Sequence, residues 1–170
     1  MARTFTASCD KMGIAKLKQD LMAYQKSLRS KNQLFIEELC NLGIPVIKRN
    51  INTAQGDSDP AHSTVITIST IGDVCKGTLT LSGKDVLFFE FGAGIYYNNG
   101  NAHPQAAQLG YGVGTYPGQR YAINPGYWWY KDDADNLHLS YGTEATMPML
   151  KASYEIISKI RQTARAIYGI

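Results

Sequence analysis

The sequence predicts an α+β fold in which a mostly antiparallel sheet of about four or five strands packs with an N-terminal helical region and a C-terminal helix. Residues 10–50 carry apolar side chains at helical spacing, residues 62–91 alternate with a period of two, and residues 148–166 return to helical spacing after a proline. The chain has 170 residues, of which 44% are hydrophobic and 18% charged, so residues 1–170 can bury a core as a single domain. We expect both helical regions to lie mainly on one face of the sheet.

The N-terminal helical region is predicted from one apolar stripe whose members follow each other at helical spacing. The stripe contains Ile14, Leu17, Leu21, Tyr24, Leu28, Phe35, Leu39, Leu42 and Val46. Lys31 interrupts it and Ser30 is a capping residue type, so we expect a break between Leu28 and Lys31. Gly43 and Pro45 should kink or end the second helix, because proline lacks a backbone N–H group. A coiled coil is the alternative, but a stripe resting on a sheet is favoured because the run is short and interrupted.

Three strands are expected in residues 62–91, joined as a meander. The first two, near residues 65–71 and 75–81, alternate apolar with polar side chains and are separated by a glycine turn. The third, residues 86–91, is apolar on both faces, which is typical of a central strand.

A long loop is expected between this meander and the next strands. Residues 92–127 hold eight of the sixteen glycines and three of the six prolines, a composition that fits neither a helix nor a long strand. We expect residues 95–127 to form an interaction arm that becomes ordered in an assembly. Residues 127–141 are predicted to form a strand hairpin, and Pro148 then suits the first turn of the C-terminal helix.

Glu90 is the one acid in the apolar run of residues 86–91, and two roles are open to it. A buried carboxylate can act as a general base, although no catalytic partner stands at a recognisable spacing. The favoured role is structural: the carboxylate accepts hydrogen bonds from the turn that contains Gly92 and Gly94, or pairs with a neighbouring copy.

Other chemically active side chains lack the spacing of a known site. The three histidines and three cysteines are isolated from one another, without a zinc or redox motif; they are His62, His103, His138, Cys9, Cys40 and Cys75. Asp132, Asp133 and Asp135 suggest a calcium loop, but the glycine and glutamate of such a loop are missing, so a polar hairpin turn is favoured. We therefore expect no enzymatic activity, no metal and no cofactor.

Aromatic side chains gather in and after the expected loop. They are Tyr96, Tyr97, Tyr111, Tyr116, Tyr121, Tyr127, Trp128, Trp129 and Tyr130. Such rings can stack on sugars or bases, but only Arg120 and Lys131 supply positive charge in this stretch. Packing onto the sheet or onto the next subunit is favoured, and ligand recognition is the alternative.

The net charge of +3 hides an asymmetry along the chain. Residues 1–56 have nine basic and four acidic side chains, residues 57–136 have four and eight, and residues 137–170 have four and two. Solvated helix faces are the favoured explanation; the alternative is that a positive face of one copy meets a negative face of another. The basic residues are too dispersed for a dedicated DNA-binding surface. No apolar run reaches the roughly 18 residues that span a bilayer, so no membrane contact is expected.

Four motifs occur in an order that resembles one protein family. They are Glu90-Phe91-Gly92-Ala93-Gly94-Ile95, His103-Pro104, Gly126-Tyr127-Trp128-Trp129-Tyr130 and Gly142-Thr143-Glu144-Ala145-Thr146-Met147-Pro148-Met149. Their order and spacing resemble the tail-component, or neck (tail completion), proteins of long-tailed double-stranded DNA bacteriophages. Ala93 stands where that family often has threonine, and Met149 where it often has phenylalanine, both conservative departures in packing terms.

The resemblance implies a structural virion protein that is assembled in the host cytoplasm and forms a ring, most simply a hexamer, at the head–tail interface. DNA would pass through the lumen without sequence-specific binding, and the partners would be a head-closure or connector protein and a tail-tube or tail-terminator protein. The alternative is a carbohydrate- or cell-surface-binding module of a phage tail that uses the aromatic loop. The residues expected to shape the subunit or its interfaces are Glu90, Phe91, Gly92, Gly94, Tyr96, Tyr97, His103, Tyr116, Arg120, Trp128, Trp129, Gly142 and Pro148.

Overall fold

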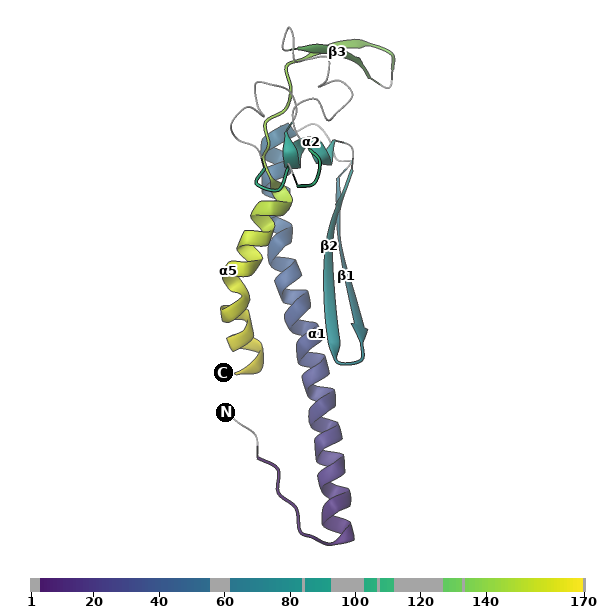
Figure 1. The fold of residues 1–170 in the computed structure, drawn as a ribbon, viewed down its shortest axis with the longest axis vertical. Helices are drawn as coiled ribbons and strands as arrows, with labels where there is room; N and C mark the ends of the chain where they lie inside the picture. Colours follow the sequence, from purple (N-terminus) through teal and green to yellow (C-terminus); the bar gives the residue numbers. More distant parts are fainter. Residues whose placement is uncertain are drawn as a thin grey trace. The chain divides into compact units, whose positions relative to one another are not determined.

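The computed structural model describes residues 4–55, 62–83, 85–92, 103–106, 108–111, 127–132 and 134–169. The chain is α+β, and its elements are α1 (Lys11–Gln55), β1 (Ser63–Ile71), β2 (Val74–Ser82), α2 (Val86–Phe91), β3 (Trp128–Lys131), β4 (Leu137–Ser140) and α5 (Pro148–Tyr168) (Figure 1). None of the described helices is long and apolar enough to cross a membrane.

Contacts between residues divide the chain into two compact units. The first unit holds Met1–Leu42, Val65–Thr80 and Glu155–Ile170, and the second holds Gly43–Thr64 and Leu81–Tyr154. The boundary between the units divides α1 after Leu42 and α5 after Tyr154, so each unit contains one part of both helices.

Helix α1 is continuous over 45 residues, so the break expected between Leu28 and Lys31 is absent, and Pro45 lies inside the helix. A proline in a helix interior costs roughly 3 kcal/mol. Ile47 and Ile51 follow it and are 0% and 5% exposed, and burying each such side chain stabilises the fold by about 1.5–3 kcal/mol. Continuing the helix past Pro45 therefore gains more from burial than the proline costs.

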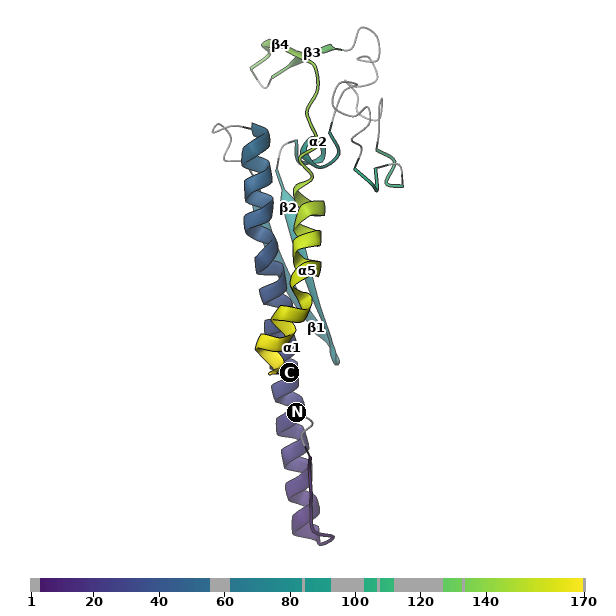
Figure 2. The ribbon, with the colours of Figure 1, turned by 90° about the vertical axis from the view of Figure 1, so that its left-hand side faces the viewer.

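In the first unit, the β1–β2 hairpin and α5 both pack against α1 (Figure 1 and Figure 2). Gly77 of β2 approaches α1 so closely that a Cβ atom there would lie 2.5 Å from Ile36 Cγ2 and 2.8 Å from Cys40 Sγ. At the other end of the chain, the hydroxyl of Tyr168 in α5 donates a hydrogen bond to Asn32 Oδ1 at 2.6 Å. Both strands of the hairpin alternate between half-buried and exposed residues, which confirms the period of two read from the sequence.

The predicted sheet of four or five strands is wrong. The described strands form two separate two-stranded sheets, β1–β2 and β3–β4. The second sheet is antiparallel and pairs Trp129 with Leu139, in the region where a hairpin was predicted.

The third strand of the predicted meander is also wrong, because residues 86–91 form the short helix α2. A short run that is apolar on all sides fits a buried strand and a buried helix equally well by periodicity. The decisive local feature is Asp85, which has a φ of 62° and accepts hydrogen bonds from the N–H groups of Phe88 and Phe89. This tight reversal starts a helical turn and takes the chain out of the β1–β2 sheet.

Candidate functional site

Glu90 and His103 are the buried polar or charged side chains in the described part of the chain, at 7% and 4% exposure. Both belong to the second unit. Helix α2 carries Glu90 inward together with Phe89 and Phe91, which are also buried. A carboxylate among aromatic rings loses its hydration, so it must find hydrogen-bond donors inside the protein.

The donors to Glu90 are main-chain groups at the start of α5. Met149 N–H donates to Oε2 at 2.7 Å, and Leu150 N–H donates to Oε1 at 2.9 Å. These are the first two N–H groups of the helix, because Pro148 has none. The position before the helix holds Met147, whose side chain cannot cap. Glu90 therefore caps α5 from 59 positions away, and its negative charge lies where the helix dipole favours it.

The main chain of α2 adds a second connection to the same place. The carbonyl oxygen of Phe89 accepts hydrogen bonds from Thr146 N–H at 2.8 Å and Met147 N–H at 3.0 Å. Met147 has a φ of 53°, an uncommon conformation for a residue with a side chain, and Pro148 beside it is fully buried. We call this set, formed by Phe89, Glu90 and residues 146–150, the α2–α5 clamp.

His103 completes the hydrogen bonding of the clamp. Its Nε2 atom lies 3.1 Å from Glu90 Oε1, and Gln105 N–H donates to its Nδ1 atom at 3.1 Å. Because Nδ1 accepts a hydrogen bond, the proton of a neutral imidazole resides on Nε2, and His103 donates to Glu90. The ring of Phe91 lies edge-on to His103 at 4.7 Å and stacks on Tyr111 at 4.2 Å, which fixes the imidazole in place.

This geometry gives Glu90 a supporting role. Oε1 receives two donors and Oε2 receives one, and the side chain is only 10% exposed. A general base needs a lone pair directed at a substrate proton, whereas these oxygens already face Met149, Leu150 and His103. The structural interpretation of Glu90 thus fits. Among the described residues, the hydrogen bonds to Glu90 involve Met149, Leu150 and His103, whereas Gly92 N–H donates to Phe88; residues 93 and 94 of the suggested turn lie outside the described residues. In the parts of the chain that the structure describes, no group of three His, Cys, Asp or Glu residues could hold a metal ion.

Five of the residues singled out from the sequence lie in the clamp or directly beside it: Glu90, Phe91, Gly92, His103 and Pro148. Gly92 ends α2 with a φ of 72°, where a side chain would be strained, and its N–H donates to the carbonyl oxygen of Phe88 at 2.7 Å.

The remaining predicted residues fall elsewhere. Gly142 follows β4 with a φ of 112° and donates its N–H to Ser140 Oγ at 3.2 Å. Trp129 lies in β3 with 59% of its surface exposed. Trp128 also lies in β3, but its side chain is outside the described residues, as are Gly94, Tyr96, Tyr97, Tyr116 and Arg120 and most of the predicted interaction arm.

Sequence reasoning missed the partners of Glu90. Met149 and Leu150 act through their main chain, and Thr146 and Met147 do the same toward Phe89. One signal could have pointed to them: a proline starts the helix, yet no Ser, Thr, Asp or Asn immediately precedes it, so its first N–H groups need an acceptor from elsewhere, and a buried acid can supply one.

A second polar cluster organises the turn between β3 and β4. One carboxylate oxygen of Asp132 accepts the N–H groups of Ala134 and Asn136, both at 2.9 Å, and the other lies 2.9 Å from His138 Nε2. The hydrogen bond with His138 and those with Asn136 hold the pKa of Asp132 well below its usual value. This is the polar hairpin turn expected from the aspartates.

Comparison of the chain with protein-family models, with curated proteins and with solved structures finds no match.

Proposed function

We propose that this chain is a structural virion protein of a long-tailed DNA bacteriophage, and that it forms a hexameric ring at the head–tail interface around the DNA channel. The observation that carries the proposal is the α2–α5 clamp. Residues from three of the four family-like motifs, Glu90, His103 and Pro148 among them, meet in one buried cluster whose hydrogen bonds join two helices. Motif residues used in this way suit a subunit that has to hold its shape in an assembly.

Exposed apolar side chains support a role in assembly. Among the described residues, eight hydrophobic side chains are buried, whereas eighteen large hydrophobic side chains are exposed. On the β3–β4 hairpin, Trp129 and Leu139 are cross-strand partners with 59% and 40% exposure, and Leu137 beside them is 62% exposed. Clustered apolar groups of this kind mark interaction surfaces.

A ring needs a heterologous interface, in which one patch of a subunit meets a different patch of the next. The basic first third and the acidic middle of the chain offer complementary charges for such a contact. The neighbours in the virion would be a head-closure or connector protein and a tail-tube or tail-terminator protein, and DNA would pass through the lumen without sequence-specific contacts.

Cryo-electron microscopy of purified virions tests the proposal. We expect a closed ring of this protein between head and tail. Absence of the protein from virions, or a monomer at the tail tip that binds cell-wall sugar, would refute the neck assignment and favour the carbohydrate-binding alternative.

A further inference from the structure

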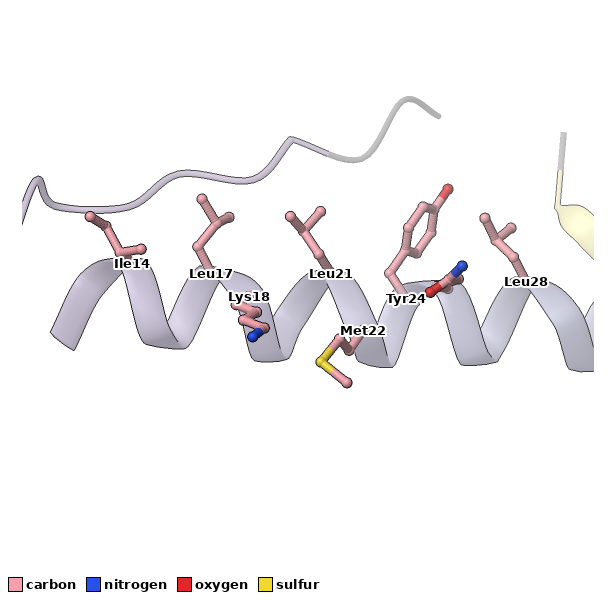
Figure 3. Close-up of a pocket in the computed structure, with 8 residues that line it drawn as sticks. Ile14, Leu17, Lys18, Leu21, Met22, Tyr24 and Leu28 are labelled. Atoms are coloured by element: carbon pink, nitrogen blue, oxygen red, sulfur yellow. The ribbon is translucent and has the colours of Figure 1, made fainter. Parts of the chain in front are cut away.

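The first half of α1 carries a coiled-coil stripe that the rest of the described chain covers only in part. Ile14, Leu17, Leu21, Tyr24 and Leu28 follow each other at steps of three and four, the a/d pattern of a heptad repeat. We call these five residues the α1 seam. Figure 3 shows them pointing to the same side of the helix, and at 1.5 Å per residue they cover about 21 Å of it. Ile14 is 60% exposed and Leu21 is 45% exposed.

The segment before α1 covers the seam only in part. Residues 4–10 run over the same side of the helix (Figure 3), and Gly13 permits this because a Cβ atom there would collide with Ser8. Phe5 is the one large apolar side chain in that segment, and its ring lies 5.4 Å from the ring of Tyr24. Leu17, Tyr24 and Leu28 are half-buried, whereas Ile14 and Leu21 stay exposed and are the parts of the seam that a partner can still cover.

The stripe of the seam continues along α1 into a contact between helices. One heptad beyond Leu28 the stripe reaches Phe35, whose ring meets that of Tyr168 in α5 edge-on at 5.7 Å. Within the first unit, the stripe therefore already accepts one helix at Phe35. A second helix laid on the seam would extend the same kind of packing toward the start of α1.

The basic charge around the seam indicates which kind of helix can dock on it. Residues 11–31 contain six basic side chains and one acid, and α5 contains four basic side chains and one acid. Both long helices of this chain are therefore basic, and a second copy that laid either of them on the seam would bring like charges together. The seam is also narrow, with two apolar positions in seven, whereas helices that lie on a membrane present a broad apolar face.

We propose that the α1 seam docks an amphipathic helix of another protein, one whose apolar stripe is flanked by acidic residues. Lys18 lies beside the seam, between Leu17 and Leu21, and is placed to pair with such a flank. The proposal does not depend on ring formation, because it concerns a surface within one unit of one chain.

The test uses the full chain and two synthetic helical peptides of about three heptads. Both peptides have leucine at the a and d positions; one has glutamate at e and g, and the other has lysine there. Binding is measured by fluorescence anisotropy for the unaltered protein, for Leu21→Glu, and for Ala23→Glu. Ala23 is exposed and lies about 200° around the helix from Leu21, so the control adds the same charge away from the seam. Circular dichroism checks that both variants keep their helix content.

We expect the glutamate peptide to bind, with an affinity that falls as salt is added. Leu21→Glu should weaken this binding about tenfold or more, because it places a charge in the apolar contact. Ala23→Glu should change it by no more than about twofold. No binding of the glutamate peptide, equal binding of the lysine peptide, or equal effects of the two substitutions would overturn the proposal. It would also be overturned by Leu21-dependent dimers in sedimentation, which would make a second copy the occupant. Leu21-dependent binding to vesicles with anionic lipid would overturn it in favour of a membrane.

Discussion

Replacing Glu90 with glutamine tests whether the α2–α5 clamp stabilises the fold. The amide keeps one oxygen for Met149 or Leu150 but turns an NH2 group toward the other N–H, and it removes the negative charge at the start of α5. Losing one hydrogen bond to a charged group costs about 1.5–3 kcal/mol, and losing the interaction with the helix dipole adds about 0.3–1 kcal/mol. We therefore expect Glu90→Gln to lower the free energy of unfolding by about 2–4 kcal/mol.

Urea denaturation followed by tryptophan fluorescence measures this change. Glu144→Gln is the matched control, because it removes the same charge from an exposed side chain in the segment leading to α5. That control should alter the free energy of unfolding by less than about 0.5 kcal/mol. If Glu90→Gln is no more destabilising than Glu144→Gln, the clamp does not hold the fold together and the reasoning is wrong.

Three further predictions concern other parts of the chain. Gly77→Ala should cost about 1–3 kcal/mol in thermal or urea unfolding, because its Cβ would press on α1; a loss no larger than that of exposed Lys76→Ala would contradict it. Tyr168→Phe should cost about 0.5–1.5 kcal/mol through the lost hydrogen bond to Asn32, and an unchanged unfolding midpoint would argue against that bond. The pKa of Asp132 is lowered in the folded state, so its contribution to the β3–β4 turn is complete above about pH 3.8 and is lost as the pH falls below it. A carbon-detected NMR titration should place the midpoint of Asp132 below 3.8, and a midpoint at or above 3.8 would refute the assigned hydrogen bonds.

The long helix shows what periodicity reveals and what it hides. The apolar stripe correctly indicated a helix at the start of the chain, because its spacing depends only on which residues face one side. We expected Gly43 and Pro45 to kink or end the helix; an end there is wrong, because the local propensity of proline is outweighed by the burial of Ile47 and Ile51. Ile47 and Ile51 belong to the second unit, most of which lies far from them in the sequence. Their burial therefore could not be predicted from the residues next to them in the chain.

The clamp shows a different limit. Glu90 stood out because an acid in an apolar run must be satisfied by something, and His103 was named through its motif. Their meeting could not be read from the sequence, because residues 86–91 fit a strand as well as a helix. Met149 and Leu150 donate through main-chain N–H groups, which all residues except proline have, so their side-chain types could not reveal this role.

The α2–α5 clamp also has a consequence for protein engineering. Because Glu90 and Met149 hold the two ends of a 59-position span together, the span is closed at its base independently of its length. Closing a longer loop is inexpensive: each doubling of its length costs only about 0.6 kcal/mol in chain entropy. A foreign peptide or an affinity tag grafted into this span, away from Phe91, His103 and Tyr111, should therefore leave the frame on either side intact, because the groups that fix it are untouched.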